Sequence, residues 1–239
     1  MLFSRFGRPS RSPRPPISVP LSLSLETPLD RAFASRTSYA VVKRCLDVVG
    51  SAILLVLVAP IMLAIALAIA FDSGLPIIYR GERLGRDGRL IHVLKFRTMR
   101  DGSHRHLEEL LAADEERRLE YSANRKLKND PRRTRVGVVL RRTSMDELPQ
   151  LLNVLMGDMS LIGPRPYMPD ELEGRPEAAE ILSVSPGITG LWQVNGRSER
   201  TFEERLALEV DYVRNRSLLL DLKIAVRTIA AVISGRGAF

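Results

Sequence analysis

The sequence predicts an α+β fold in which a re-entrant membrane helix hairpin precedes a mostly helical cytoplasmic domain with a small β-hairpin. Three observations support this prediction. An uncharged apolar run covers residues 48–71 and contains a proline near its middle. Two strand-like segments follow the run, separated by Asp87 and Gly88. The later part of the chain repeats apolar residues mainly at helical spacing.

Residues 1–37 form the first predicted segment. Prolines stand there among serines and arginines, a composition that cannot bury a core, so we predict a disordered basic tail near a membrane surface. The whole chain has a formal net charge of +8, which suits anionic lipids, nucleotides or nucleic acid. Aromatic residues make up only 5%, and no nucleic-acid-binding motif is present, so no nucleic acid partner is expected. The single cysteine, Cys45, excludes an intrachain disulfide and fits a reducing compartment.

The second predicted segment, residues 38–72, contains the apolar run. As a helix, the run is long enough to cross a hydrocarbon core of ~30 Å. Both of its flanks are basic, and positive flanks favour the cytoplasm, so a simple crossing would place one of them outside. Pro60 lies in the middle of the run, where it removes a helix hydrogen bond. We therefore favour a hairpin broken at Pro60, with both ends cytoplasmic; a kinked spanning helix is the alternative.

Residues 73–239 are predicted to form one domain with its own core. Alternating apolar residues around an Asp-Gly turn predict a β-hairpin, and helical spacing predicts the remaining elements. We expect strands at 76–80 and 90–97, and helices at 104–123, 145–156, 202–214 and 218–233. The last helix carries Asp221, Lys223 and Arg227 among apolar residues, so a place in the membrane interface and a place in the core both fit it.

Two adjacent carboxylates, Asp146 and Glu147, follow the basic residues Arg141 and Arg142. A carboxylate pair beside arginines can hold a divalent cation and a phosphate group together, as phosphoryl transfer requires. The other interpretation is an ordinary helix start, with Ser144 as the N-cap and both acids near the positive end of the helix dipole. The local pattern fits both interpretations.

Several blocks, in order along the chain, resemble the bacterial sugar transferases, which are monotopic polyprenyl-phosphate hexose-1-phosphate transferases. The blocks are Lys43–Asp47 before the apolar run, Lys95–Met99, Ser144–Asn153, Gly157–Pro166, Pro186–Arg197 and Asp211–Val213. The chain resembles the short, exopolysaccharide-type members, because it lacks the extra transmembrane helices that longer members carry ahead of the catalytic region. One departure is Ala59, which precedes Pro60 where some relatives have serine.

The resemblance implies a catalytic phosphoglycosyl transferase domain at residues 73–239. It would transfer a hexose 1-phosphate, of the galactose or glucose type, from a UDP-sugar to undecaprenyl phosphate, releasing UMP, in the first membrane step of exopolysaccharide assembly. Asp146 would attack the sugar-linked phosphorus to form a phosphoaspartyl intermediate, and Asp146 and Glu147 would hold Mg²⁺. Three family positions near the substrate phosphate are matched here by Arg141, Arg165 and Arg197. Two further polar positions that are important in the family are matched by Lys95 and Asp221. A solvated strand lysine and a helix-surface aspartate are the alternatives for Lys95 and Asp221.

The resemblance also implies partners and a location. We expect a UDP-sugar, undecaprenyl phosphate, Mg²⁺ and membrane lipid, with the catalytic domain on the cytoplasmic face of the bacterial inner membrane; a homodimer stays open. A membrane-tethered scaffold or regulator that has kept the fold without the chemistry is the alternative function. The intact acid pair, Lys95 and Arg165 argue against it. A basic nucleic-acid-binding protein is a further alternative, and the long apolar run argues against that.

Overall fold

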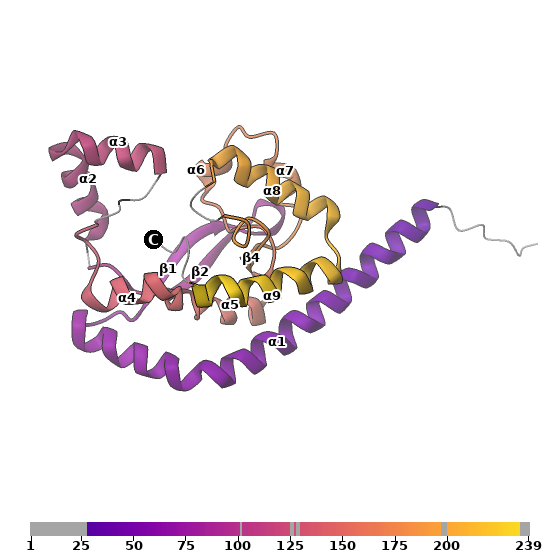
Figure 1. The fold of residues 1–239 in the computed structure, drawn as a ribbon, viewed down its shortest axis with the longest axis horizontal. Helices are drawn as coiled ribbons and strands as arrows, with labels where there is room; N and C mark the ends of the chain where they lie inside the picture. Colours follow the sequence, from indigo (N-terminus) through magenta and orange to yellow (C-terminus); the bar gives the residue numbers. More distant parts are fainter. Residues whose placement is uncertain (1–27, 101, 125–126, 128–129, 197–199, 235–239) are drawn as a thin grey trace, which may run out of the picture. The chain divides into compact units, whose positions relative to one another are not determined.

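The structure is a computed structural model that describes residues 28–100, 102–124, 127, 130–196 and 200–234. The chain divides into two compact units, Met1–Thr37 and Ser38–Phe239. The first unit contains the start of helix α1, Pro28–Ser73. Of the predicted tail at residues 1–37, residues 28–37 lie in this helix, and residues 1–27 lie outside the described residues. The second unit contains the rest of α1 and all the other elements (Figure 1). The described residues include one helix apolar and long enough to cross a membrane, at Thr37–Ser73.

Helix α1 continues through Pro60 without an interruption. Our prediction of a break at this residue is therefore wrong for the helix itself, although α1 curves along its length (Figure 1). A proline removes one helix hydrogen bond and bends the axis, while the hydrogen bonds before and after it keep the helix together. The re-entrant path through the membrane stays a prediction.

The predicted β-hairpin is confirmed, although its first strand begins and ends later than the predicted 76–80. Strands β1, Ile78–Leu84, and β2, Leu90–Phe96, pair antiparallel, with Ile78 opposite Phe96. A short 3-10 turn η1, Arg86–Gly88, joins them, with Asp87 and Gly88 both at positive φ. Ile78 and Phe96 pack against Ile65 and Ile69 of α1, so one face of the hairpin rests on the long helix.

The segment 104–123 forms two helices instead of the single one we expected, α2 at Ser103–Ala113 and α3 at Glu115–Asn124. Asp114 separates them in an extended conformation, and its side chain accepts a hydrogen bond of 3.1 Å from the backbone N–H of Arg117. A short polar side chain that satisfies a backbone donor in this way favours a new helix start over helix continuation.

Helix α4, Arg135–Thr143, was not predicted. It lies close to the end of β2, because a Cβ atom at Gly137 would be 2.2 Å from the carbonyl oxygen of Thr98. Only glycine allows that approach. The predicted helix 145–156 forms as a 3-10 turn η2, Met145–Glu147, and a short helix α5, Gln150–Met156.

The last part of the chain combines two short parallel strands with helices. Strands β3, Ser160–Ile162, and β4, Gly187–Thr189, were not predicted, because three-residue strands are too short to show a period of two. Helices α6, Pro169–Leu172, and α7, Ala178–Ile181, lie between them in sequence. Helices α8, Phe202–Asn215, and α9, Leu218–Ser234, confirm the last two helix predictions.

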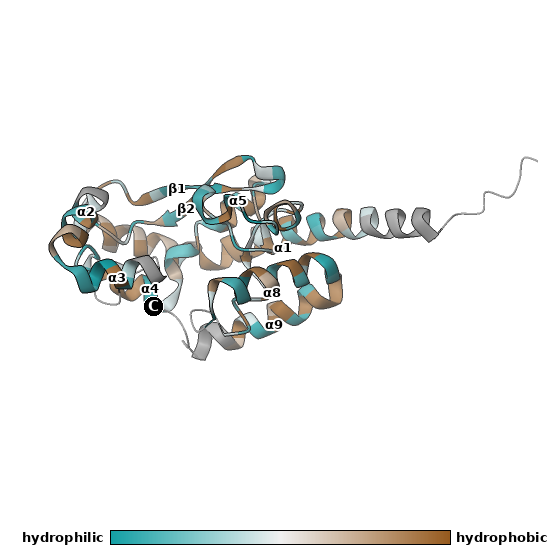
Figure 2. Ribbon diagram, turned by 90° about the horizontal axis from the view of Figure 1, so that it is seen from above, coloured by the Kyte–Doolittle hydropathy of each residue, from teal (hydrophilic) through white to brown (hydrophobic). Residues whose placement is uncertain are grey.

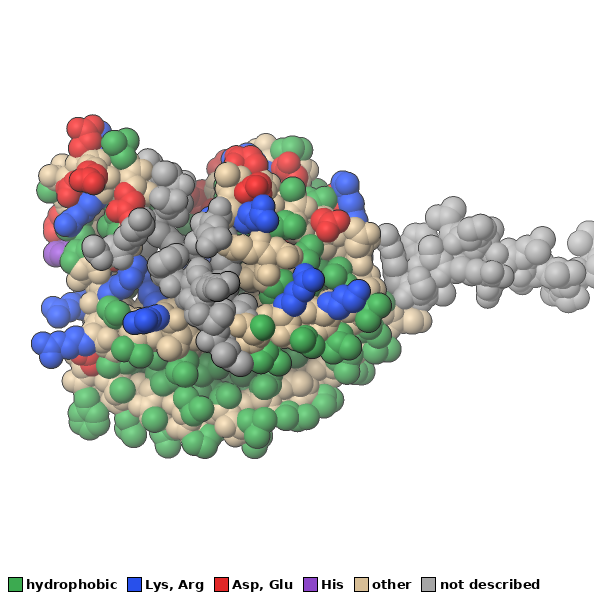
Figure 3. All heavy atoms as spheres, in the orientation of Figure 1, with side chains coloured by type: hydrophobic (Ala, Val, Ile, Leu, Met, Phe, Trp, Pro, Cys, Tyr) green, Lys and Arg blue, Asp and Glu red, His purple; other side chains and the backbone are tan. Residues whose placement is uncertain are grey.

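Four helices of the second unit contribute side chains to an exposed apolar surface. It contains Val56 and Leu57 of α1, Val138 and Val139 of α4, Leu152 and Met156 of α5, and Leu219, Leu222, Val226 and Ile229 of α9. Helices α1 and α9 are largely apolar in Figure 2, and apolar side chains gather along the α1 side of the molecule in Figure 3. Helix α9 buries Asp221 and Ile224 inward and exposes leucines outward, which is the pattern of a helix at a membrane interface.

Candidate active site

The acid pair lies in the turn η2, between α4 and α5. Ser144 precedes the pair with φ 57° and ψ 16°, and its backbone N–H closes the end of α4. Ser144 is the N-cap residue of η2, as the alternative interpretation of this segment expects, but its side chain makes no capping hydrogen bond. Positive φ is uncommon for a residue other than glycine, and such backbone often marks a functional turn. Here the conformation turns the chain so that Asp146 is buried and Glu147 stays partly exposed.

Lys95 and Arg141 meet this pair from two other elements. Lys95 of β2 contacts Glu147 with Nζ to Oε1 at 2.6 Å, and these side chains are 31% and 37% exposed. Arg141 of α4 donates from Nε to the Thr98 hydroxyl at 3.0 Å, beside the close approach that Gly137 allows. Four of the predicted site residues therefore share one electrostatic environment, which we call the acid cluster: Lys95, Arg141, Asp146 and Glu147.

Burial raises the pKa of Asp146 to about 6. The positive charges of Lys95 and Arg141 oppose that rise, whereas the negative charge of Glu147 adds to it. Burial also lowers the pKa of the Arg141 guanidinium, while the Asp146 carboxylate raises it. The result is a poorly solvated carboxylate that is still ionised at neutral pH, which suits a nucleophile.

Arg165, in the Pro-Arg-Pro segment, contacts residues that do not belong to the acid cluster. Its backbone N–H donates to Oε1 of Glu209 at 2.8 Å, and its guanidinium lies 3.5 Å from Oε1 of Glu171 and 5.8 Å from the centre of the Tyr167 ring. Glu209 of α8 is fully buried, and burial raises its pKa to about 8. Arg165 thus has a fixed backbone and a side chain that is 26% exposed.

Asp221 has contacts of a different kind. Its Oδ2 accepts hydrogen bonds of 2.9 Å from the Tyr39 hydroxyl and from Nζ of Lys43, both on α1. Its Oδ1 accepts one of 2.8 Å from the Tyr212 hydroxyl. These contacts join α1, α8 and α9, so Asp221 has a structural position here. Arg197, the remaining predicted phosphate-binding residue, lies outside the described residues.

The structure gives several motif residues positions that sequence reasoning missed. Arg44 donates to the carbonyl oxygens of Val154 and Leu155 at 2.6 and 3.0 Å, at the end of α5. Buried Asp47 accepts from the backbone N–H of Leu161 at 3.0 Å. The charged block before the apolar run therefore attaches α1 to the domain that carries the acid cluster.

Two further motif residues hold the hairpin. Buried Arg97 donates to the carbonyl oxygens of Ser73 and Leu75 at 2.6 and 2.9 Å, where α1 ends. Fully buried Asn153 of α5 accepts from the N–H of Leu94 and donates to the carbonyl oxygen of His92, at 2.9 and 2.8 Å. The signal that could have indicated these contacts is the presence of charged or polar residues inside otherwise apolar segments.

The acid pair also fits a magnesium ion. Within the residues described, no group of three or more His, Cys, Asp or Glu side chains is placed to hold a metal. Mg²⁺ is usually bound by one or two carboxylates, with water and substrate phosphates completing its octahedron. Two adjacent carboxylates next to a lysine and an arginine satisfy that requirement without a third protein ligand.

The model of the family "Bacterial sugar transferase" matches residues 38–235, so the chain belongs to this family and is a transferase. It is 44% identical to the exopolysaccharide production protein ExoY of Rhizobium meliloti, over 82% of this chain and 88% of that protein. It is 43% identical to the undecaprenyl-phosphate galactose phosphotransferase of Salmonella typhimurium, over 86% of this chain but 43% of that protein. It is 41% identical to the UDP-glucose:undecaprenyl-phosphate glucose-1-phosphate transferase of Caulobacter vibrioides, over 82% of this chain and 72% of that protein. The family predicted from the motifs is confirmed.

Proposed function

We propose that this protein transfers a hexose 1-phosphate, of the galactose or glucose type, from a UDP-sugar to undecaprenyl phosphate. The acid cluster carries the proposal, because it places a buried carboxylate next to a second carboxylate and two cations in a chain of this family. The names of the Salmonella and Caulobacter relatives support the lipid acceptor and the two sugars. The name of the Rhizobium relative supports a role in exopolysaccharide production.

Asp146 is the nucleophile of the proposed reaction. Its carboxylate oxygen attacks the phosphorus that bears the sugar; a new P–O bond forms while the bond to the bridging oxygen breaks, and UMP leaves with that oxygen and its electron pair. A phosphate oxygen of the lipid then attacks the same phosphorus and releases the Asp146 carboxylate. The two displacements in turn give ping-pong kinetics.

The other members of the cluster stabilise charge. Lys95 and Arg141 lie where positive charge offsets the phosphate oxygens during both displacements. Glu147, ion-paired with Lys95, fixes the position of that lysine. When bound by Asp146 and Glu147, Mg²⁺ would neutralise the diphosphate and stabilise the departing UMP.

We also propose that α1 is re-entrant and that the catalytic domain lies on the cytoplasmic face of the inner membrane. Contacts at both ends of the apolar run support this path. Before the run, Lys43 and Arg44 bind α9 and the end of α5. After the run, Oδ2 of Asp72 accepts from the N–H of Val136 at 3.0 Å, and Arg97 binds the carbonyl oxygen of Ser73. A helix spanning the membrane would separate these ends by ~30 Å of hydrocarbon, so it would have to break one set of contacts.

The test of the reaction uses the full-length protein in membranes with Mg²⁺, polyprenyl phosphate and a panel of labelled UDP-sugars. We expect labelled lipid and UMP with UDP-galactose or UDP-glucose, and a phosphosugar adduct of the native protein when the donor is given alone. The Asp146→Asn protein should give neither. A native protein that forms no lipid-linked sugar with any donor would favour the scaffold alternative.

The test of the membrane path uses cysteine labelling in intact cells. In a Cys45→Ser background, Ser24→Cys reports on the tail and Ser103→Cys on the domain after α1. We expect both to be protected from an impermeant reagent and both to react after lysis. Labelling of Ser24→Cys alone in intact cells would show a spanning helix, and Pro60→Leu should shift the protein towards that result.

A further inference from the structure

Helix α4 carries a cation on the face that it exposes to solvent. Exposed Arg135 stands three residues before Val138 and four before Val139, and both valines are exposed as well. Residues three and four positions apart lie side by side on a helix, so the guanidinium and the two valines share one face. The helix sequence, residues 135–143, contains no acidic residue that could neutralise this arginine.

Helix α9 has the same arrangement with two cations. Exposed Lys223 stands four residues after Leu219 and three before Val226, and exposed Arg227 follows one turn later. Both cations therefore border the exposed apolar face of α9. Asp221, the one acidic residue in the sequence of this helix, is buried and bonded to α1 and α8.

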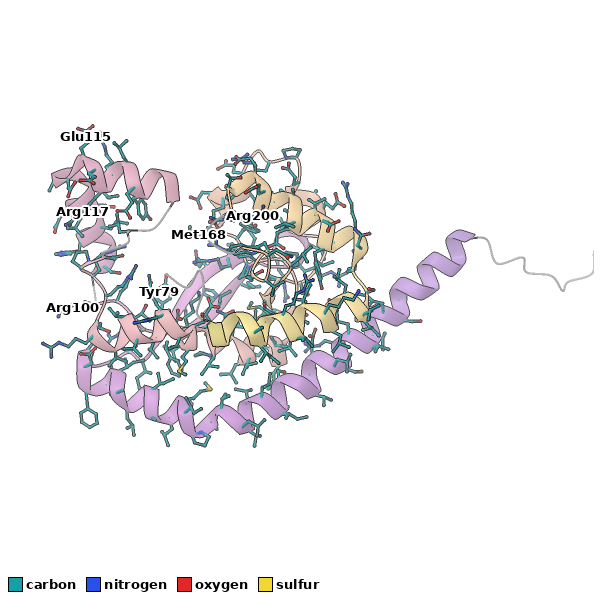
Figure 4. The ribbon with its side chains drawn as sticks, in the orientation of Figure 1. Tyr79, Arg100, Glu115, Arg117, Met168 and Arg200 are labelled. Carbon is teal, nitrogen blue, oxygen red and sulfur yellow. The ribbon has the colours of Figure 1, made fainter. Side chains whose placement is uncertain are left out.

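These three cations differ from many other arginines of the molecule in having no acidic partner. Within the part of the chain that the structure describes, the side chains of Arg135, Lys223 and Arg227 make no hydrogen bond or ion pair. Six arginines outside the apolar helices each pair with a carboxylate: Arg89, Arg117, Arg118, Arg175, Arg200 and Arg214. Of these, Arg117 and Arg200 lie on the side of the molecule away from α1 (Figure 4). Lysine and arginine side chains without acidic partners thus occur next to the exposed apolar surface, and cations border the apolar band in Figure 3.

An anionic lipid matches both parts of this surface. The aliphatic side chains of α4 and α9 can enter the outer part of the hydrocarbon, while the longer lysine and arginine side chains reach the level of the head groups. A second copy of the chain matches it less well, because two such surfaces placed together would bring cations against cations. A zwitterionic lipid carries no net negative charge that would offset the three cations.

We infer that Arg135, Lys223 and Arg227 bind the head groups of anionic phospholipids at the membrane surface. The inference rests on the proposed function, which places this domain on the cytoplasmic face of a membrane. Each such cation near an anionic leaflet favours partitioning by about fivefold. Because α4 ends where the turn with Asp146 begins, lipids bound at α4 hold the acid cluster close to the membrane surface.

Lipid retention tests the inference without turnover. The full-length protein is reconstituted in bilayers of equal parts phosphatidylglycerol and phosphatidylcholine, and mass spectrometry measures the lipids that stay bound after mild detergent exchange. We expect the native protein to retain phosphatidylglycerol over phosphatidylcholine by at least about fivefold. The triple variant Arg135→Gln, Lys223→Gln, Arg227→Gln should retain the two lipids nearly equally. Arg142, on the same face of α4, stays unchanged because it adjoins Arg141 of the acid cluster.

The matched control removes the same amount of charge elsewhere. The combined variant Arg89→Gln, Arg117→Gln, Arg214→Gln should keep the native lipid ratio, since each of these arginines already pairs with an acid. The conservative variant Arg135→Lys with Arg227→Lys should keep it too, because this contact needs the positive charge and not the planar guanidinium.

Three outcomes would overturn the inference even if the native protein is an active transferase. The triple variant could keep the native lipid ratio, or the control could lose the lipid preference equally, which would assign the preference to net charge. A raised KM for polyprenyl phosphate at an unchanged lipid ratio would show that these cations bind the acceptor. If the native protein transfers no sugar with any donor, the proposed function fails, and lipid retention still decides this inference.

Discussion

Two lysine–carboxylate ion pairs, one in the acid cluster and one next to α1, have almost the same chemistry but differ in how far they are exposed to solvent. In the acid cluster, Lys95 meets Glu147 at 2.6 Å, and about a third of each side chain is exposed. Next to α1, Lys43 meets Asp221 at 2.9 Å, and those side chains are 17% and 10% exposed. The Asp221 carboxylate also accepts hydrogen bonds from Tyr39 and Tyr212.

The difference separates a lysine–carboxylate pair that stays partly exposed from one whose hydrogen bonds join helices. Asp221 of α9 uses both oxygens for three donors from two other helices, α1 and α8, so its hydrogen-bonding capacity serves the fold. The pair in the acid cluster is accessible and lies beside Asp146, whose ionised form burial has made less favourable. The resemblance to the family assigns importance to both Asp146 and Asp221, and we infer a different reason for each from their surroundings.

The largest effect should come from Asp146→Asn. An amide of nearly the same shape cannot attack phosphorus, so we expect turnover to fall at least about a thousandfold, as with other nucleophile removals. Thermal unfolding and membrane association should stay native. Radiolabelled transfer and intact-mass measurement check both points. Measurable turnover by the purified variant would end the assignment of Asp146 as nucleophile.

Asp221→Ala tests the other side of the comparison. Removing one partner of a buried pair leaves Lys43 and the Tyr39 hydroxyl without the acceptor that Asp221 provides, whereas the Tyr212 hydroxyl keeps the carbonyl oxygen of Ile162. We therefore expect a loss of about 3–5 kcal/mol in the free energy of unfolding. Turnover per folded molecule should stay within about twofold of native, given that the acid cluster is untouched. Denaturant unfolding in detergent, combined with active-site titration, measures the two quantities separately.

The double variant Lys43→Met with Asp221→Leu is the matched control. It removes both charges, so it should recover part of the lost stability. A large fall in kcat for Asp221→Ala, at native stability, would show instead that Asp221 acts in the reaction as the family resemblance implies.

Local patterns predicted the parts of the fold that local interactions determine. Alternation and an Asp-Gly turn predicted the β-hairpin, and helical spacing predicted α8 and α9. The pattern around Asp114 did not predict two helices, because one side-chain hydrogen bond decides between continuation and a new start. Ser144 looked like an N-cap, and its positive φ has no signal in a single sequence.

The sequence predicted a set of candidate site residues but not how they are arranged. Asp146 and Glu147 share one motif, Lys95 belongs to another and Arg141 precedes the acid pair by a few residues, and the structure brings the four together. Contacts across long sequence distances, such as Lys43 with Asp221 or Arg97 with Ser73, depend on how α1 packs, and no local periodicity encodes that.

Arg165→Lys should have an intermediate effect. Arg165 combines a backbone held by Glu209 with an accessible guanidinium, so its side chain can present two donors in a fixed plane. Lysine keeps the positive charge but lacks the planar pair of N–H donors of a guanidinium. Losing one charge-assisted hydrogen bond costs about 1.5–3 kcal/mol, or roughly ten- to a hundredfold in kcat/KM. Arg142→Lys, at an exposed position of α4, is the control. If the activity of Arg165→Lys stays within about twofold of native, Arg165 contributes only its positive charge and no bidentate hydrogen bonding.

The smallest effect should be a pH dependence of stability that Glu209 causes. Burial raises its pKa from an ordinary 4.5 to about 8, so the folded protein binds this proton more firmly than the unfolded chain. The stabilising contribution is complete below pH 4.5 and is lost as the pH rises towards 8. We expect the Tm of the native protein to fall between pH 6 and 8, and the fall to be smaller in Glu209→Gln, which cannot ionise. Differential scanning fluorimetry in detergent checks this, and equal slopes in the two proteins would show that Glu209 is ionised when folded.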